Sequence, residues 1–177
     1  MKLFSYSEIG AKNNMILFEK EIKKRLMNSC LYEIGRTCDM LELTFRPCKT
    51  DSSISEVFHI QSPFRILCDD HILTSDRDIY VAHDRDIENY SYYSTERNSE
   101  FDFLVNDKTL LFKNAVISDV TISPYGDISI EMHCEQSDLI INCFNNTTEN
   151  NDESWRFFRH HSDLPHIVCY RDYITEE

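Results

Sequence analysis

The part of the chain that most constrains the fold is residues 115–134, where apolar and polar residues alternate on both sides of a turn. The run VISDVTI is followed by SPYGD and then by ISIEMHC. Such alternation is typical of a strand with one buried face, because successive side chains point to opposite faces. Pro124 suits the second position of a type I turn and Gly126 its fourth. The segment therefore predicts a β-hairpin that belongs to a half-buried sheet.

Similar period-two runs occur on both sides of this hairpin. Strands are expected within residues 39–75 and 115–171, and they include LELTF, FHI, FRIL, LIINCF, SWRFF and HIVCY. Pro63 interrupts one extended run, which predicts an edge or a bulge there. Asp69 and Asp70 predict the turn of another hairpin. These patterns together indicate a predominantly antiparallel arrangement.

A different period precedes the strands. Apolar residues recur at three- and four-residue steps over about 14–28, which predicts an amphipathic helix that covers the sheet. One helix followed by many short strands predicts an α+β fold, with an N-terminal helix packed on a predominantly antiparallel β-sheet or sheet pair. The length of 177 residues fits a single domain, 1–177.

The charge of the chain restricts its partners. The formal net charge is −13, and residues 51–177 hold twenty-five Asp/Glu against nine Lys/Arg. Such a surface repels nucleic acids and membranes and attracts a basic protein. No apolar run approaches the roughly 20 residues of a membrane span, and the N-terminus lacks the apolar core of a signal peptide. We therefore expect a cytoplasmic protein.

Glycine and cysteine usage exclude several kinds of site. The chain has three scattered glycines, whereas phosphate-binding loops need clustered glycines, so a nucleotide-binding fold is not expected. The seven cysteines are scattered and never spaced as CxxC, which argues against a disulfide framework or a zinc site. Most of them are expected to be reduced and buried.

The stretch ESWRFFRHHSDLPHIV, residues 153–168, contains the single tryptophan and three of the seven histidines. Adjacent histidines in a strand point to opposite faces, so they cannot share one metal ion. A nucleophile pair of Cys169 and His166 is disfavoured for the same reason, because residues three apart in a strand also point to opposite faces. The alternation instead favours a hairpin with Trp155 and Phe157 in the core. We expect no metal and no cofactor, and a small hydrolytic enzyme using carboxylate or His/Cys chemistry stays open as an alternative.

Residues 76–102 are expected to form an acidic, tyrosine-rich surface loop. Ten acids and three arginines lie between Asp69 and Asp102, so this stretch contributes −7. Acids accelerate the encounter with a basic partner, and tyrosines bury area at low entropic cost. The alternative is a solvated linker. The expected partner-binding residues are Asp76, Asp78, Asp84, Asp86, Glu88, Tyr90, Tyr92 and Tyr93.

The segments FHIQSPFRIL, ILTSDRDIY, ESWRFF and HIV resemble those of an uncharacterised family of small bacterial proteins. That family carries a His-Ile-Gln stretch with an aromatic–Arg pair, a nearby Asp-Ile-Tyr, and a terminal Glu-x-Trp-Arg-aromatic before a His-aliphatic strand. The resemblance implies a bacterial cytosolic accessory protein of the immunity-protein kind, and it transfers no catalytic residue. It implies fold-supporting roles, with direct partner contact as the alternative, for His59, Gln61 and Arg65. Phe64 is expected to be structural.

The leading hypothesis is an inhibitory protein-binding module. It would be an immunity protein that occludes a basic, nuclease-like toxin domain, such as the C-terminal domain of a cognate toxin. The expected partner is a protein, and no nucleic acid, membrane or metal is expected. Besides the hydrolytic enzyme, a regulatory or scaffold subunit is the remaining alternative.

Overall fold

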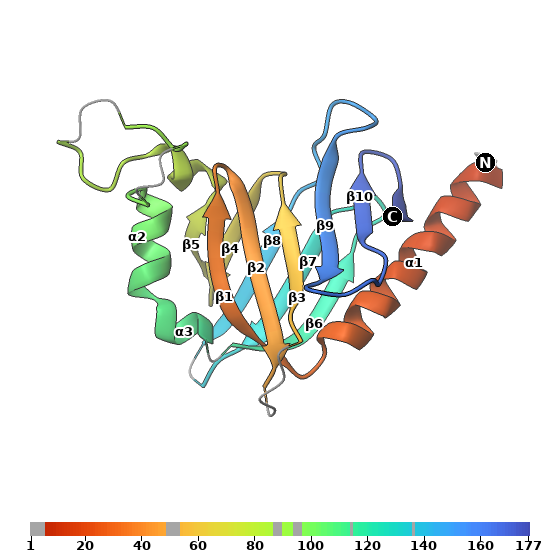
Figure 1. Cartoon of the computed structure of the whole chain (residues 1–177), viewed down its shortest axis with the longest axis horizontal. Coiled ribbons are helices and arrows are strands. Elements are labelled where there is room, and N and C mark those ends of the chain that lie inside the picture. The colour runs from red at the N-terminus through yellow and green to blue at the C-terminus, as the bar shows by residue number, and fades with distance from the viewer. Residues whose placement is uncertain (1–5, 49–53, 87–89, 94–96, 114, 136) are drawn as a thin grey trace.

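The computed structural model describes residues 6–48, 54–86, 90–93, 97–113, 115–135 and 137–177 (Figure 1). Within these residues the helices are α1 (Tyr6–Leu26), η1 (Asp76–Tyr80, a 3-10 helix), α2 (Glu100–Asp107) and α3 (Thr109–Lys113). The strands are β1 (Ser29–Thr37), β2 (Met40–Pro47), β3 (Glu56–Ile60), β4 (Phe64–Cys68), β5 (His71–Ser75), β6 (Val116–Ile122), β7 (Ile128–His133), β8 (Asp138–Cys143), β9 (Glu153–Arg159), β10 (Ile167–Tyr170) and β11 (Ile174–Glu176).

The described strands form one eleven-stranded sheet in the order β11-β10-β9-β3-β2-β1-β6-β7-β8-β4-β5. All neighbouring pairs are antiparallel. The predicted α+β class and antiparallel sheet are therefore confirmed, as a single sheet. The hairpin predicted over 115–134 is β6–β7, and its turn is closed by the Gly126 N–H, which donates to the Ser123 carbonyl at 3.0 Å.

The sheet has a weak point where β1 meets β6, because their register contains one pair, Cys30 with Val116. Figure 1 shows the strands on either side of this point facing each other, with β1–β3, β9 and β10 toward the viewer. Helix α1 packs against β6 and β11, whereas α2 packs against β1 and β5. The helices therefore cover opposite sides of the folded sheet, and the expected packing of the N-terminal helix on the sheet is confirmed.

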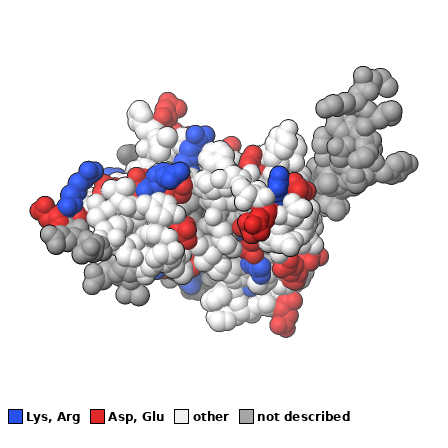
Figure 2. All heavy atoms as spheres, turned by 90° about the horizontal axis from the view of Figure 1, so that it is seen from above, with Lys and Arg blue, Asp and Glu red and all other residues white. Residues whose placement is uncertain are grey.

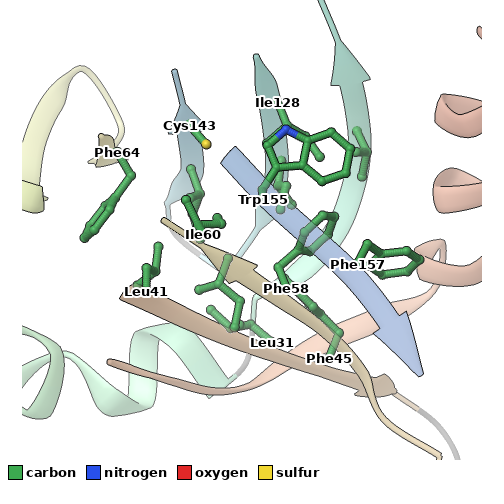
Figure 3. Close-up of a cluster of buried hydrophobic side chains, with 14 of the residues drawn as sticks. Leu31, Leu41, Phe45, Phe58, Ile60, Phe64, Ile128, Cys143, Trp155 and Phe157 are labelled. Atoms are coloured by element: carbon green, nitrogen blue, oxygen red, sulfur yellow. The ribbon is translucent and has the colours of Figure 1, made fainter. Parts of the chain in front are cut away.

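The core lies between the two groups of strands (Figure 3). Trp155 on β9 is fully buried, as predicted, and its ring meets that of Phe58 edge-on at 6.0 Å between centroids. The Trp155 indole N–H donates to the Gly126 carbonyl at 2.7 Å. That bond joins β9 to the β6–β7 turn, so the tryptophan links the two groups of strands. Phe157 and Phe64 also lie in this core.

Helix α1 is held to the sheet by a buried carboxylate. Glu56 on β3 accepts a hydrogen bond from Arg25 of α1 at 3.1 Å and another from Arg159 of β9 at 2.8 Å. The Arg25 guanidinium also lies over the Phe157 ring, 4.3 Å from its centroid. A buried carboxylate with two guanidinium partners and a full set of hydrogen bonds fixes the position of the helix relative to the strands.

Several element boundaries differ from the prediction. The helix predicted over 14–28 begins at Tyr6 and ends at Leu26. The sequence pattern does not reveal its first turns, because the residues before Met15 are mostly polar and carry no apolar period. Strands β1 and β11 lie outside the predicted ranges 39–75 and 115–171. A register irregularity between Leu31 and Glu33 breaks the alternation of β1, which explains why the pattern does not reveal it.

Most of the cysteines are free, as expected, but one pair is an exception. Cys30 and Cys48 form a disulfide, with 5.1 Å between their Cα atoms, a usual separation for such a bond. The antiparallel register brings them together, because Cys30 lies opposite Arg46 and Cys48 follows two residues later. The other five cysteines are free, but only Cys143 and Cys169 are buried.

Candidate protein-interaction surface

The predicted loop over 76–102 is partly regular structure. Helix η1 occupies its first five residues, and α2 begins at Glu100. Between them the chain is closed at its base: Ala82 and Ser99 form an isolated β-bridge, and the Glu100 N–H donates to the Val81 carbonyl at 2.8 Å. The prediction of one long irregular loop is therefore wrong at both ends, because short helices and a bridge anchor this segment to the fold.

One buried arginine of β1 ties three segments together. Arg36 is 4% exposed, and its Nε and Nη2 donate to the Asp102 carboxylate at 3.0 and 2.7 Å. Its Nη1 donates to the Cys38 carbonyl in the β1–β2 turn at 2.7 Å and to the Tyr92 carbonyl at 2.8 Å. A planar guanidinium can make these bonds simultaneously, whereas an ammonium group cannot. Arg36 thus fixes the turn, the start of α2 and the tyrosine-bearing segment.

Asp102 is the buried counter-ion of Arg36. Its carboxylate also accepts hydrogen bonds from the backbone and hydroxyl of Ser99, at 3.1 and 2.7 Å, which completes a capping box at the start of α2. Burial alone would raise the pKa of Asp102, but the hydrogen bonds from Arg36 and Ser99 outweigh it and hold the pKa below its ordinary value. Asp102 is therefore ionised at neutral pH and stabilises the fold as an anion.

Three tyrosines form an exposed aromatic cluster beside the Arg36–Asp102 ion pair. The rings of Tyr80 and Tyr92 meet edge-on at 4.8 Å, and those of Tyr92 and Tyr93 lie 4.0 Å apart. Tyr93 is 67% exposed and Tyr80 43%. The Tyr80 hydroxyl donates to the carboxylate of Asp39, in the β1–β2 turn, at 3.2 Å. We call Tyr80, Tyr92, Tyr93 and Asp39 the tyrosine patch.

The phenols of Tyr80 and Tyr92 stay protonated at neutral pH. A hydrogen bond with Tyr93 is the main cause that raises the pKa of Tyr92 to about 12. Burial, followed by the nearby Asp39 carboxylate, raises the pKa of Tyr80 above its ordinary value. Tyr80 and Tyr92 therefore present neutral aromatic rings, and the exposed Asp39 carboxylate lies beside Tyr80.

The remaining predicted contact residues have different roles. Asp84 and Asp86 are exposed, whereas Asp78 accepts a hydrogen bond from the Ser75 backbone at 2.8 Å and caps η1. Tyr90 is half-buried, and its hydroxyl donates to the Ile79 carbonyl. Asp76 begins η1 and is half-buried, and Glu88 lies outside the described residues. In Figure 2, basic and acidic side chains are interspersed on the face seen from above.

The residues expected to support the fold do not form one site. The half-buried His59 meets the Phe158 ring edge-on at 4.9 Å, and burial lowers its pKa. Gln61 is exposed, and its backbone N–H donates to the Ser154 carbonyl at 2.9 Å. The exposed Arg65 lies over the Phe144 ring, 5.0 Å from its centroid.

The chemistry available near the C-terminus does not favour a nucleophile. Burial raises the pKa of Cys169 to about 12, so its thiol is protonated at neutral pH. His166 stacks on Phe158 and contacts Arg156 at 3.0 Å, while burial and that arginine lower its pKa. Within the described ranges, no group of three or more His, Cys, Asp or Glu side chains could hold a metal ion. No helix in the described part of the chain is long and apolar enough to span a membrane.

Three residues of this surface escaped the sequence analysis: Arg36, Asp39 and Tyr80. Tyr80 stands in the quoted DRDIY segment, and Asp39 lies between two apolar runs where a turn was foreseeable. Arg36 gave no such signal, because its partner Asp102 is 66 residues away in sequence.

Comparison with protein-family models, with curated proteins and with solved structures finds no significant match to this chain.

Proposed function

We propose that the protein is an inhibitory protein-binding module, an immunity protein that neutralises a bacterial toxin domain by covering it. The observation that carries this proposal is the tyrosine patch, which is exposed yet held in place by the buried Arg36. Tyrosine is enriched among the few residues that carry most of the binding energy at protein interfaces. Because Arg36 fixes the backbone at Tyr92, the patch loses little further entropy when a partner binds.

The charge around the patch supports a basic partner. Asp39, Asp84 and Asp86 are exposed, and the net charge of the chain is −13. Opposite charges on two proteins accelerate their association and exclude partners of the wrong sign. A nuclease-like toxin domain with a basic cleft has the complementary charge. An immunity protein of this kind binds with nanomolar affinity, about −12 kcal/mol.

The test is protection in co-expression, combined with capture of the proteins encoded beside this one. Tyr93→Ala should abolish protection and capture. The matched control is Tyr125→Ala, because Tyr125 is an equally accessible tyrosine, 77% exposed, on the β6–β7 turn outside the patch. Protection at a one-to-one ratio supports occlusion, whereas protection by a small fraction of the partner's concentration supports an enzyme. Absence of any neighbouring partner, with no protection, would overturn the proposal.

The cytoplasm is the proposed location, and the Cys30–Cys48 disulfide makes it testable. Disulfides persist in oxidising compartments and are rare in the cytosol. Thiol labelling of denatured protein taken directly from cells should modify all seven cysteines if the protein is cytoplasmic. Labelling of five would place the mature protein in an oxidising compartment instead.

A further inference from the structure

We propose that the tyrosine patch is a docking site for an arginine side chain of the partner. The guanidinium would lie over the exposed Tyr93 ring and pair with the Asp39 carboxylate. This inference rests on the proposed function for the identity of the partner, but the chemistry of the site rests on four residues alone.

The first support is the combination of rings and carboxylate. Aromatic faces carry negative electrostatic potential and attract cations that approach within about 6 Å of the ring centroid. Tyr92 lies between the other two rings, in contact with both, so its position sets the orientation of the cluster. Tyr93, the most exposed of the three, presents ring surface to solvent. The Asp39 carboxylate, which accepts a hydrogen bond from the Tyr80 hydroxyl, supplies the opposite charge at the Tyr80 end of the cluster.

The second support is that this chain already uses the same arrangement internally. Arg25 lies over Phe157 and donates to the Glu56 carboxylate, so a ring and a carboxylate together hold one guanidinium. The tyrosine patch offers both of these groups at the surface. Within the part of the chain that the structure describes, no Lys or Arg forms an ion pair with Asp39. In the proposed site, a partner's arginine supplies the cation that would complete the arrangement.

The third support is the way in which the site is held. Arg36 donates to the carbonyl of Cys38, the residue immediately before Asp39, and to the carbonyl of Tyr92, the residue immediately before Tyr93. One buried group therefore positions both the carboxylate and the exposed ring. Arginine suits such a site better than lysine, because a planar guanidinium can stack on a ring while it donates two parallel hydrogen bonds to a carboxylate.

The test uses a probe that does not require the partner. A short acetylated peptide with two arginines is titrated into the full chain, and the NMR signals of the Tyr93 ring and the Asp39 backbone amide are followed. The control peptide replaces arginine with citrulline, which keeps the shape and removes the charge. The arginine peptide should shift these signals, and Asp39→Asn should weaken its binding about fivefold. Asp163→Asn, an exposed carboxylate in the β9–β10 connection, should leave binding unchanged.

Three results would overturn the arginine site: equal binding of the citrulline peptide, unchanged binding to the Asp39→Asn variant, or shifts that avoid the patch. Asp39 is exposed in a turn, and unchanged Trp155 emission would show that the variant is folded. If Tyr93→Ala abolishes protection against a toxin and Asp39→Asn does not, the immunity role stands and the arginine site falls. If no toxin is neutralised but peptide binding depends on Asp39, the arginine site stands and the immunity role falls.

Discussion

Replacing Arg36 by methionine should destabilise the protein far more than an ordinary point substitution. The change removes the three hydrogen bonds to Asp102 and those to the Cys38 and Tyr92 carbonyls. It leaves the buried Asp102 carboxylate without its counter-ion. Removing one partner of a buried ion pair costs about 3–5 kcal/mol, because an uncompensated charge stays buried. Typical domains have only 5–15 kcal/mol of stability, so the expected loss is a large fraction of the total.

A double-mutant cycle separates the ion pair from the space that its side chains fill. Asp102→Asn removes the charge and keeps an oxygen that can accept hydrogen bonds from Ser99. The double variant Arg36→Met/Asp102→Asn contains no buried charge at this position. It should therefore be more stable than the sum of the single variants predicts, with a coupling energy of about 2 kcal/mol.

Urea unfolding monitored through the emission of the only tryptophan, Trp155, measures all four proteins of the cycle. Arg36→Lys is the informative control, because it retains the charge and loses the planar donor geometry. Lysine should recover only part of the stability that methionine loses. A loss below about 1 kcal/mol for Arg36→Met, or strictly additive effects in the cycle, would refute the role of Arg36 as the group that holds the surface together.

Three further predictions concern the core, the pH dependence and the charge. Trp155→Ala should cost about 3–5 kcal/mol in urea unfolding, and a wild-type emission maximum near that of free tryptophan would contradict its burial. Burial holds the pKa values of His59 and His166 below the ordinary value, so the folded state binds fewer protons than the unfolded state. The stabilisation from the two neutral histidines is present above about pH 6.5 and is lost as the pH falls through their lowered folded-state pKa values. The urea midpoint of unfolding should therefore decrease from about pH 7.5 to 5.5, and replacing both histidines by Gln should remove this decrease. Reversing Asp84 and Asp86 to Lys should slow association with an identified basic partner at low salt, and an unchanged rate in stopped flow would place them outside the interface.

Local patterns predicted the parts of the fold that depend on neighbouring residues. The 115–134 hairpin and the C-terminal hairpin around Trp155 follow from alternation and turn chemistry, both of which act over a few residues. Strand β1 was missed because its irregular register hides the alternation. The burial of Trp155 was predictable for the same local reason as the hairpin that contains it.

The candidate surface was only partly predictable, because its organisation depends on distant contacts. Tyr92 and Tyr93 were expected from composition, and both lie in the tyrosine patch. Asp39 comes from a turn far from them in sequence, and Arg36 joins these segments only through the fold. The Cys30–Cys48 bond likewise depends on strand register, which cysteine spacing does not encode.

The strand order has a consequence for how the chain folds during synthesis. Strand β3 pairs with β9, and β4 pairs with β8. Strands from the first half of the chain therefore stay unpaired on one edge until their partner strands have been synthesised. Until residues 153–159 leave the ribosome, β3 is an open edge that carries Val57, Phe58 and Ile60. Unpaired apolar edges recruit other chains, and folds with such distant pairings form in milliseconds to seconds. The nascent chain therefore passes through a period in which aggregation competes with folding, and that period ends only when β9 pairs with β3.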